Sequence, residues 1–150
     1  MKKHVYLLLL VPFLLTGCIT EWRLNNKEDR IMGVWEIEKA HYKEFGALFR
    51  DNITNRYNGD RIEFLPDFTV IYDDYSQRRF SYGEWELFAT REYFDDDSDI
   101  DFYVDMYFYD DRGGLLFDLN GAVQRLTYNR FTLRVPDRGG ETILRMRKID

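Results

Sequence analysis

Apolar and polar side chains alternate along much of the chain, and this period of two is typical of half-buried β-strands. The clearest example is the run IDFYVDMYFY at residues 100–109, in which aspartate and tyrosine occupy the second face. Its apolar face consists of Ile100, Phe102, Val104, Met106 and Phe108. Weaker alternation predicts further strands at 34–42, 61–65, 68–72, 80–88, 115–119, 124–135 and 142–149. The pattern therefore predicts about eight strands.

Turn-forming sequences separate these strands. They are NGD at 58, LPD at 65, YDDYSQ at 72, DDRGG at 110, NG at 120 and PDRGG at 136. Short connections of this kind join antiparallel neighbours, and closing the sheet removes its exposed edges. We therefore predict an all-β fold with a single antiparallel eight-stranded barrel, and a β-sandwich is the alternative.

One segment departs from the strand pattern. Phe45, Leu48, Phe49 and Ile53 are spaced at i, i+3, i+4 and i+8. This is the spacing of a helix, so a short helix is expected in the first long loop, residues 43–59.

The first 18 residues have the layout of a secretory signal. Lys2 and Lys3 precede an apolar run from Val5 to Leu15, which is too short to span a bilayer. The apolar run by itself would also fit an ordinary signal peptide or a buried first helix. The residues LTGC that end at Cys18 resemble the lipobox of bacterial lipoproteins, and this favours a lipoprotein signal.

The lipobox resemblance implies that Cys18 becomes the first residue and carries the membrane anchor, with acyl chains such as palmitate. It divides the chain into a signal peptide (1–17), a lipidated tether (18–32) and a folded domain (33–150). A flexible tether of this length would hold the domain roughly 20 Å from the lipid. Ile19 follows the cysteine where an inner-membrane lipoprotein commonly has aspartate, which favours the outer membrane of the cell envelope over the inner one.

Residues 31–149 resemble bacterial lipocalin-like lipoproteins. Gly33 and Trp35 in MGVWEIEKA match the G-x-W that opens the first lipocalin strand. The segments RIEFLPDFTVIY, YGEWEL, VQRLTYNRFTLRV and ETILRMRKI resemble later strands, although LPDFT stands where relatives often have Asp-Gly. The resemblance implies that a cation, Arg145 or Arg147, packs over Trp35. It also implies that loop 43–59 covers the open mouth of the barrel.

An up-and-down order of strands places loops 43–59, 73–79, 109–114 and 136–140 at the mouth. The tether enters at the opposite end. The charged residues expected around the mouth are Asp73, Asp74, Arg78, Asp110, Asp111, Arg112, Asp137 and Arg138.

Charge and residue content narrow the function. The whole chain carries −6 and the signal contains two lysines and no acid, so residues 18–150 carry −8. This charge argues against a nucleic-acid partner. After the signal the chain has one histidine (His41), three serines and no G-x-S-x-G motif, so we predict neither an enzyme nor a zinc site.

The acidic run DDDSDID at 95–101 is either a solvated turn or a calcium-binding loop. Asp95, Asp97 and Asp99 have the spacing of an EF-hand. Ile100 and Met106 occupy the positions of its glycine and its bidentate glutamate, so we predict no metal ligand set and no cofactor.

The chain contains 12 Phe, 11 Tyr and 3 Trp, and many of them fall on the predicted inner faces. We therefore expect a small apolar or amphipathic ligand to be bound without catalysis. The residues predicted to line its site are Trp35, Phe64, Tyr72, Trp85, Phe102, Val104, Met106, Phe117, Phe131 and Leu133. The alternative is a barrel filled by these side chains, which would serve as a structural subunit or dock an envelope protein.

Overall fold

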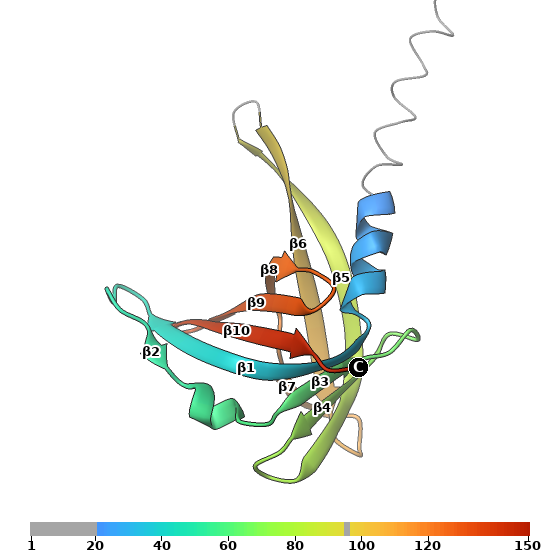
Figure 1. The fold of residues 1–150 in the computed structure, drawn as a ribbon, viewed down its shortest axis with the longest axis vertical. Helices are drawn as coiled ribbons and strands as arrows, with labels where there is room; N and C mark the ends of the chain where they lie inside the picture. Colours follow the sequence, from blue (N-terminus) through green and yellow to red (C-terminus); the bar gives the residue numbers. More distant parts are fainter. Residues whose placement is uncertain (1–20, 95–96) are drawn as a thin grey trace, which may run out of the picture.

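Eight antiparallel strands form a closed barrel in the computed structural model (Figure 1). The structure describes residues 21–94 and 97–150, and it describes the side chains of these residues except those of 91–99. The strands of the barrel are β1 (Gly33–Glu44), β3 (Arg61–Phe64), β4 (Thr69–Asp74), β5 (Arg79–Phe94), β6 (Asp97–Tyr109), β8 (Gly121–Leu126), β9 (Arg130–Asp137) and β10 (Gly140–Lys148). Each pairs with the next in this order, and β10 pairs with β1. Two short strands, β2 (Asp51–Asn52) and β7 (Leu115–Asp118), pair with β1 and β6. The predicted lipocalin-like all-β barrel is confirmed, rather than a sandwich.

The turn predicted from NG at 120 is wrong, because β7 and β8 are one interrupted strand. Both run along β6 in the same register, with Phe117 opposite Phe108 and Gly121 opposite Val104. At the interruption the Asn120 side chain accepts the bond from the Met106 amide at 2.9 Å. The single strand expected at 124–135 is instead the hairpin of β8 and β9, whose turn is closed by the 2.9 Å bond from the Thr127 amide to the Arg130 carbonyl. That turn contains neither glycine nor proline, the two residues that mark a turn most strongly in a sequence.

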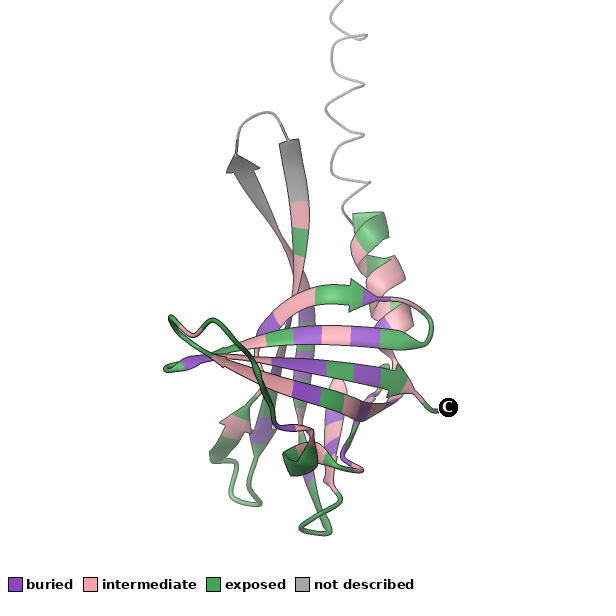
Figure 2. Ribbon diagram, turned by 60° about the vertical axis from the view of Figure 1, so that its left-hand side comes forward, coloured by how far each residue is buried: buried purple, intermediate pink, exposed green. Residues whose placement is uncertain are grey.

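Alternation along the strands places one apolar face inside the barrel (Figure 2). The side chains that are less than 2% exposed include Trp35, Phe64, Phe108 and Phe131. Trp35 packs edge-on against Phe131, and Phe64 packs edge-on against both Phe131 and Trp85. Edge-to-face rings of this kind fill the interior at close range.

A helix over residues 21–31 packs at the barrel end at which the chain enters. Ile31 is fully buried, and its carbonyl accepts a 2.6 Å bond from the indole of Trp35. Leu24 packs against the core. The expectation of a flexible tether is therefore wrong for residues 21–31, because their apolar side chains find a place on the barrel. Cys18 lies outside the described residues.

The cation over Trp35 is Lys148, with its ammonium 5.4 Å from the ring centroid. The expectation of Arg145 or Arg147 is therefore wrong. Both arginines alternate to the outside of β10, whereas Lys148 is in phase with the buried Leu144 and Met146. Its ammonium also donates to the Met32 carbonyl.

The β5–β6 hairpin extends beyond the rest of the barrel on the side of the N-terminal helix (Figure 1). Phe102 lies on this extension and is half-buried. The ammonium of Lys27, on the helix, lies 5.1 Å from its ring centroid. Phe102 therefore meets the helix, while Val104, Met106 and Phe108 continue the same face into the barrel core.

The first long loop contains a short helix, but it begins later than predicted. It is the 3-10 helix η1 (Thr54–Tyr57). Phe45, Leu48 and Phe49 lie before it with 68%, 90% and 83% of their surfaces exposed. Their helical spacing therefore does not form a helix. Ile53 is the member of this set that is buried against the core.

Candidate functional site

The barrel interior holds the predicted ligand-lining residues as a packed core. Eight of the ten lie in the buried core cluster, namely Trp35, Phe64, Tyr72, Trp85, Val104, Met106, Phe131 and Leu133. Phe117 packs against that cluster, and Phe102 meets the N-terminal helix. The rings of Phe108 and Phe117 are stacked with centroids 4.5 Å apart, and Tyr72 packs edge-on against both. These side chains fill one another's space, as expected for an eight-stranded barrel.

A shallow pocket of about 370 Å³ remains at the mouth. Its apolar floor includes Leu119, Val135 and Leu144, and η1 contributes Tyr57. Two carboxylates, Asp118 and Asp137, reach its rim. The pocket therefore combines apolar and acidic groups. Of the charged residues expected around the mouth, Asp137 lines it, whereas Asp118 was not singled out in the sequence.

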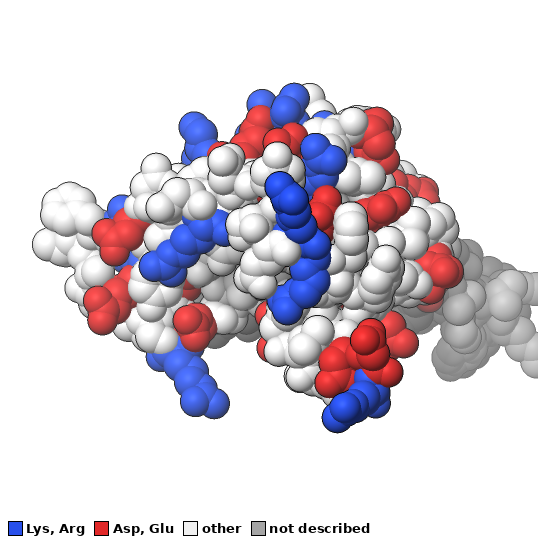
Figure 3. All heavy atoms as spheres, turned by 90° about the horizontal axis from the view of Figure 1, so that it is seen from below, with Lys and Arg blue, Asp and Glu red and all other residues white. Residues whose placement is uncertain are grey.

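Charges of both signs are interspersed over the end of the barrel that carries the turns after β4 and β6 (Figure 3). A mixed rim of this kind gives no strong local field of either sign.

Asp60 is the one charged group within the buried core of the described residues, with 2% of its surface exposed. It accepts a 2.5 Å hydrogen bond from the Tyr72 hydroxyl and a 3.0 Å bond from the Tyr75 amide. Burial raises the pKa of its carboxyl above the ordinary value, and the two hydrogen bonds partly oppose that rise. Burial and the neighbouring Asp60 carboxylate also raise the pKa of the Tyr72 hydroxyl. This pair fixes the start of β3 against β4.

The outer face of β5 and β6 carries aromatic and acidic side chains in cross-strand rows. We call this surface the acidic–aromatic face. Its members are Tyr82, Glu84, Glu86 and Phe88 from β5 and Tyr103, Asp105, Tyr107 and Tyr109 from β6. No lysine or arginine is among them.

The strand register sets the rows of this face. Tyr82 lies opposite Tyr109, and the rings of Phe88 and Tyr103 stack with centroids 5.7 Å apart. Between these rows Glu86 lies directly opposite Asp105. Like charges directly opposite each other destabilise a sheet. Burial, together with Glu86 and Asp118, raises the pKa of Asp105, so the site favours a cation that would relieve the repulsion.

A groove of about 630 Å³ runs beside these rows. It is lined by Asp67, Phe68, Thr69, Glu84, Trp85, Glu86, Tyr107 and Tyr109. Three of these residues are carboxylates and four are aromatic. The face of an aromatic ring attracts arginine and lysine, and the carboxylates attract the same partners.

Phe68 is held at the edge of this groove in a strained backbone conformation. Its φ is +64°, and it follows the turn closed by the 3.1 Å bond from its own amide to the Leu65 carbonyl. Glycine usually occupies such a position, because a side chain there meets its own backbone. Yet Phe68 has a large ring, 49% exposed, whose centroid lies 5.2 Å from that of Trp85. Strain retained at an exposed aromatic residue points to a role outside the fold.

Two substitutions at Phe68 measure the backbone strain alone, because both remove the contact of its ring with Trp85. We expect Phe68→Ala to be less stable than Phe68→Gly by about 1 kcal/mol, because alanine keeps the strained φ and glycine relieves it. Urea unfolding of the two variants measures the difference. Equal stabilities, or a more stable alanine variant, would show that the residue is not strained.

One edge of β5 is open next to the acidic–aromatic face. The β4–β5 ladder ends with Thr69 opposite Glu84, and the next bond runs 2.9 Å from the Trp85 amide to the Phe68 carbonyl. Beyond Trp85, no described strand pairs with this edge of β5. An unpaired strand edge is a template for an added strand.

The other residues considered for chemistry in the sequence are His41 and the acidic run at 95–101. His41 is half-exposed on β1. Asp95, Asp97 and Asp99 lie outside the part of the chain whose side chains are described. Over the described residues no three His, Cys, Asp or Glu side chains gather to hold a metal ion. Within the same part of the chain no helix has the length and apolar character needed to cross a bilayer.

Comparisons of the chain with protein-family models, with curated proteins and with solved structures gave no match.

Proposed function

We propose that this protein is a lipid-anchored, non-catalytic interaction subunit of the bacterial cell envelope. Its filled barrel serves as a rigid scaffold. The acidic–aromatic face binds an extended, basic segment of another envelope protein. The observation that carries this proposal is the groove of about 630 Å³, which joins exposed aromatic rings to carboxylates without a basic side chain.

The filled interior supports a role on the outside. Trp35, Phe64 and Phe131 are each at most 1% exposed, and the Phe131 ring packs against both of the others. An apolar ligand of ordinary size needs several hundred cubic ångströms, and these rings occupy the space where it would lie.

The chemistry of the face supports a basic partner. Arginine and lysine would meet Glu84, Glu86 and Asp105 as ion pairs and Tyr107 as a cation–π contact. Tyrosine is also enriched where proteins meet. The open edge of β5 would add backbone hydrogen bonds to an extended segment, and the side chains would then select its sequence.

The anchor is supported by the sequence pattern that ends at Cys18 and by the resemblance to lipocalin-like lipoproteins. The residue after Cys18 favours the outer membrane. The helix at 21–31 leads into β1 at the end opposite the mouth. The acidic–aromatic face is formed by the outward side chains of β5 and β6, so it lies along the side of the barrel.

Removing the proposed lipid site tests the anchor. Cys18→Ser is expected to give a protein without acyl label, or an uncleaved precursor, because serine has no thiol to carry the lipid. Metabolic labelling with a fatty acid and detergent partition measure the result. An acyl label that persists in the variant would contradict the lipoprotein assignment.

A charge reversal tests the docking face. We expect an extended peptide of alternating arginine and valine to bind the wild-type protein, and Glu86→Lys to weaken binding at least tenfold, or about 1.4 kcal/mol. The reason is that the substitution replaces an attraction at the groove with a repulsion. Isothermal titration calorimetry measures both affinities.

Two controls accompany this titration. Glu44→Lys makes the same charge change at the exposed end of β1, opposite Gly140 of β10, and is expected to leave the affinity within about threefold of wild type. A peptide with glutamate in place of arginine should not bind. Equal weakening by the two substitutions, or no binding of the basic peptide, would overturn the docking proposal.

The mouth pocket favours a second function, the binding of a small amphipathic ligand. Its apolar floor of Leu119, Val135 and Leu144 would hold the apolar part, and Asp118 and Asp137 would favour a cationic or hydroxylated end. Its volume of about 370 Å³ lies at the lower end of the range of ligand sites.

A further inference from the structure

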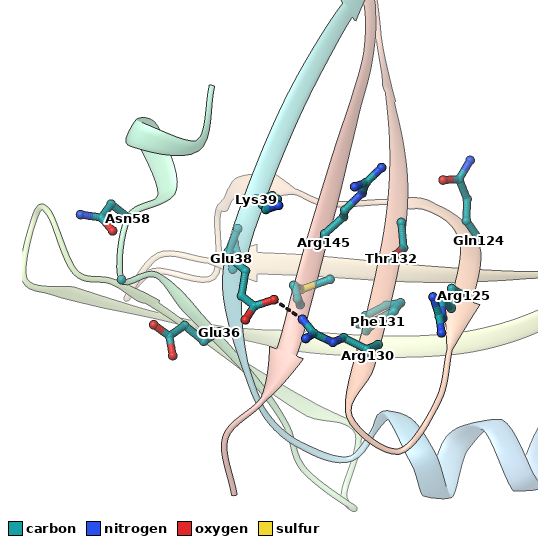
Figure 4. Close-up of a pocket in the computed structure, with 13 residues that line it drawn as sticks. Glu36, Glu38, Lys39, Asn58, Gln124, Arg125, Arg130, Phe131, Thr132 and Arg145 are labelled. Carbon is teal, nitrogen blue, oxygen red and sulfur yellow. Dashed lines mark hydrogen bonds and ion pairs between the residues drawn. The ribbon is translucent and has the colours of Figure 1, made fainter. Parts of the chain in front are cut away.

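The outer face of the opposite wall, formed by β1, β8, β9 and β10, carries a second groove of about 1010 Å³ (Figure 4). It is polar and mostly basic, in contrast to the acidic–aromatic face. Its lining comes from all four strands and from Asn58 and Gly59 in the loop after η1.

The paired strands align four polar side chains across this groove. Lys39 on β1 lies opposite Arg145 on β10, Arg145 lies opposite Thr132 on β9, and Thr132 lies opposite Arg125 on β8. We call these four residues the cationic row. Adjacent strands lie about 4.8 Å apart, so the row extends about 14 Å across the strands.

The charges of the cationic row are not compensated. Over the described residues, Lys39, Arg125 and Arg145 take part in no ion pair within 4.0 Å. Lys39 and Arg145 are direct cross-strand neighbours of like charge, an arrangement that destabilises a sheet. All three cations are exposed and free to turn toward a ligand.

The neighbouring row on the same face is neutral. Glu38 pairs with Arg130 (Figure 4). Glu38 also pairs with Arg147 at 2.9 Å, and Glu36 lies 3.6 Å from Arg147. The sheet therefore balances its arginines with glutamates in one row and leaves three cations unbalanced in the next. This contrast separates the cationic row from an ordinary charged surface.

We propose that the cationic row binds a linear, phosphate-bearing polyanion that lies across the four strands. Arginine suits phosphate because its planar donors can bind two oxygens at once. The Thr132 hydroxyl and the Gln124 amide add hydrogen-bond donors within the same groove. A row of cations that spans about 14 Å matches a chain of phosphates better than a single ion.

The position of the row favours a soluble chain over a membrane surface. Lys39 lies six residues along β1 from Gly33, where the chain enters the barrel, which places it about 20 Å from that end. The groove also opens from the side wall of the barrel. Arg125 lies one residue before the end of β8, whereas Lys39 lies further along the wall, so a flat bilayer at the entry end would meet only part of the row.

Binding of a short inorganic polyphosphate chain tests this site. We expect the wild-type protein to bind it more tightly than orthophosphate, and Arg145→Gln and Arg125→Gln each to weaken binding about tenfold or more, because each loses a charge-assisted contact. Added salt should also weaken it. Calorimetry measures the affinities, and unchanged melting temperatures confirm that the exposed substitutions leave the fold intact.

Arg134→Gln is the matched control. Arg134 lies on the same face with its guanidinium 3.8 Å from Glu141, outside the cationic row, and its loss changes the net charge by the same amount. We expect it to weaken polyphosphate binding less than about threefold. Equal weakening by Arg134→Gln and Arg145→Gln would indicate general attraction and overturn the site. The site would also be overturned if the protein did not bind polyphosphate, or if it bound only to vesicles that contain phosphatidylglycerol.

Discussion

Phe131→Ala is expected to lower the free energy of unfolding by about 3–5 kcal/mol, because it opens a cavity in a packed core. Phe131 is fully buried, and its ring centroid lies 5.6 Å from that of Trp35 and 6.1 Å from that of Phe64. Chemical denaturation, followed by tryptophan fluorescence, measures the loss. In a barrel with a vacant pocket the loss would be visibly smaller, since the ring would already border empty space.

Phe45→Ala provides the control. Phe45 has the same side chain, but 68% of its surface is exposed, so its removal should change stability by less than about 0.5 kcal/mol. A small loss at both positions would contradict the filled interior.

Asp60→Ala is expected to lower the free energy of unfolding by about 1–3 kcal/mol. The reason is that the buried Tyr72 hydroxyl would lose the carboxylate oxygen that accepts its 2.5 Å hydrogen bond. The Tyr75 amide would lose its acceptor as well. Asp60→Asn should cost less, because its carbonyl oxygen can accept from Tyr75 while its amide donates to the Tyr72 oxygen. Urea unfolding at neutral pH ranks the three proteins. Equal losses for alanine and asparagine would show that the hydrogen bonds contribute little.

The stability difference between the wild-type protein and Asp60→Asn is expected to depend on pH. The folded state raises the pKa of Asp60 above 3.8, so it binds the proton more tightly than the unfolded chain does. The contribution of Asp60 to stability is therefore largest at low pH and falls as pH rises through the interval from 3.8 to the raised value. Relative to Asp60→Asn, the wild-type protein should lose stability across that interval. A difference that is constant with pH, or that changes in the opposite direction, would contradict the raised pKa.

The period-two pattern was sufficient to predict the barrel and most of its core. Val104, Met106 and Phe108 are buried as predicted from one strand. The same pattern could not place Phe102, because β6 continues past the barrel and meets the helix at 21–31 with an unchanged alternation. Period two identifies a face of a strand, and the neighbouring element decides what covers that face.

The two outer faces depended on register, which the sequence alone does not reveal. The polar residues of β6 were visible in IDFYVDMYFY, but only the pairing with β5 places Asp105 opposite Glu86. The cationic row depends in addition on bulges between Ile37 and Lys39 and between Val123 and Arg125. A single extra residue reverses which side chains face outward. The strained φ of Phe68 had one signal in the sequence, a phenylalanine in LPDFT at a turn position that usually requires glycine.

The central claim is that the protein binds its partner on the outside of a filled barrel, and an amide chemical-shift map tests it most directly. The arginine–valine peptide would be titrated into the labelled protein. We predict shifts in the 84–88 segment of β5, the 103–109 segment of β6 and the turn at 65–68, with little change at Tyr57 and Leu144 in the mouth. Shifts centred on the mouth or the barrel interior, with the acidic–aromatic face unchanged, would contradict the account.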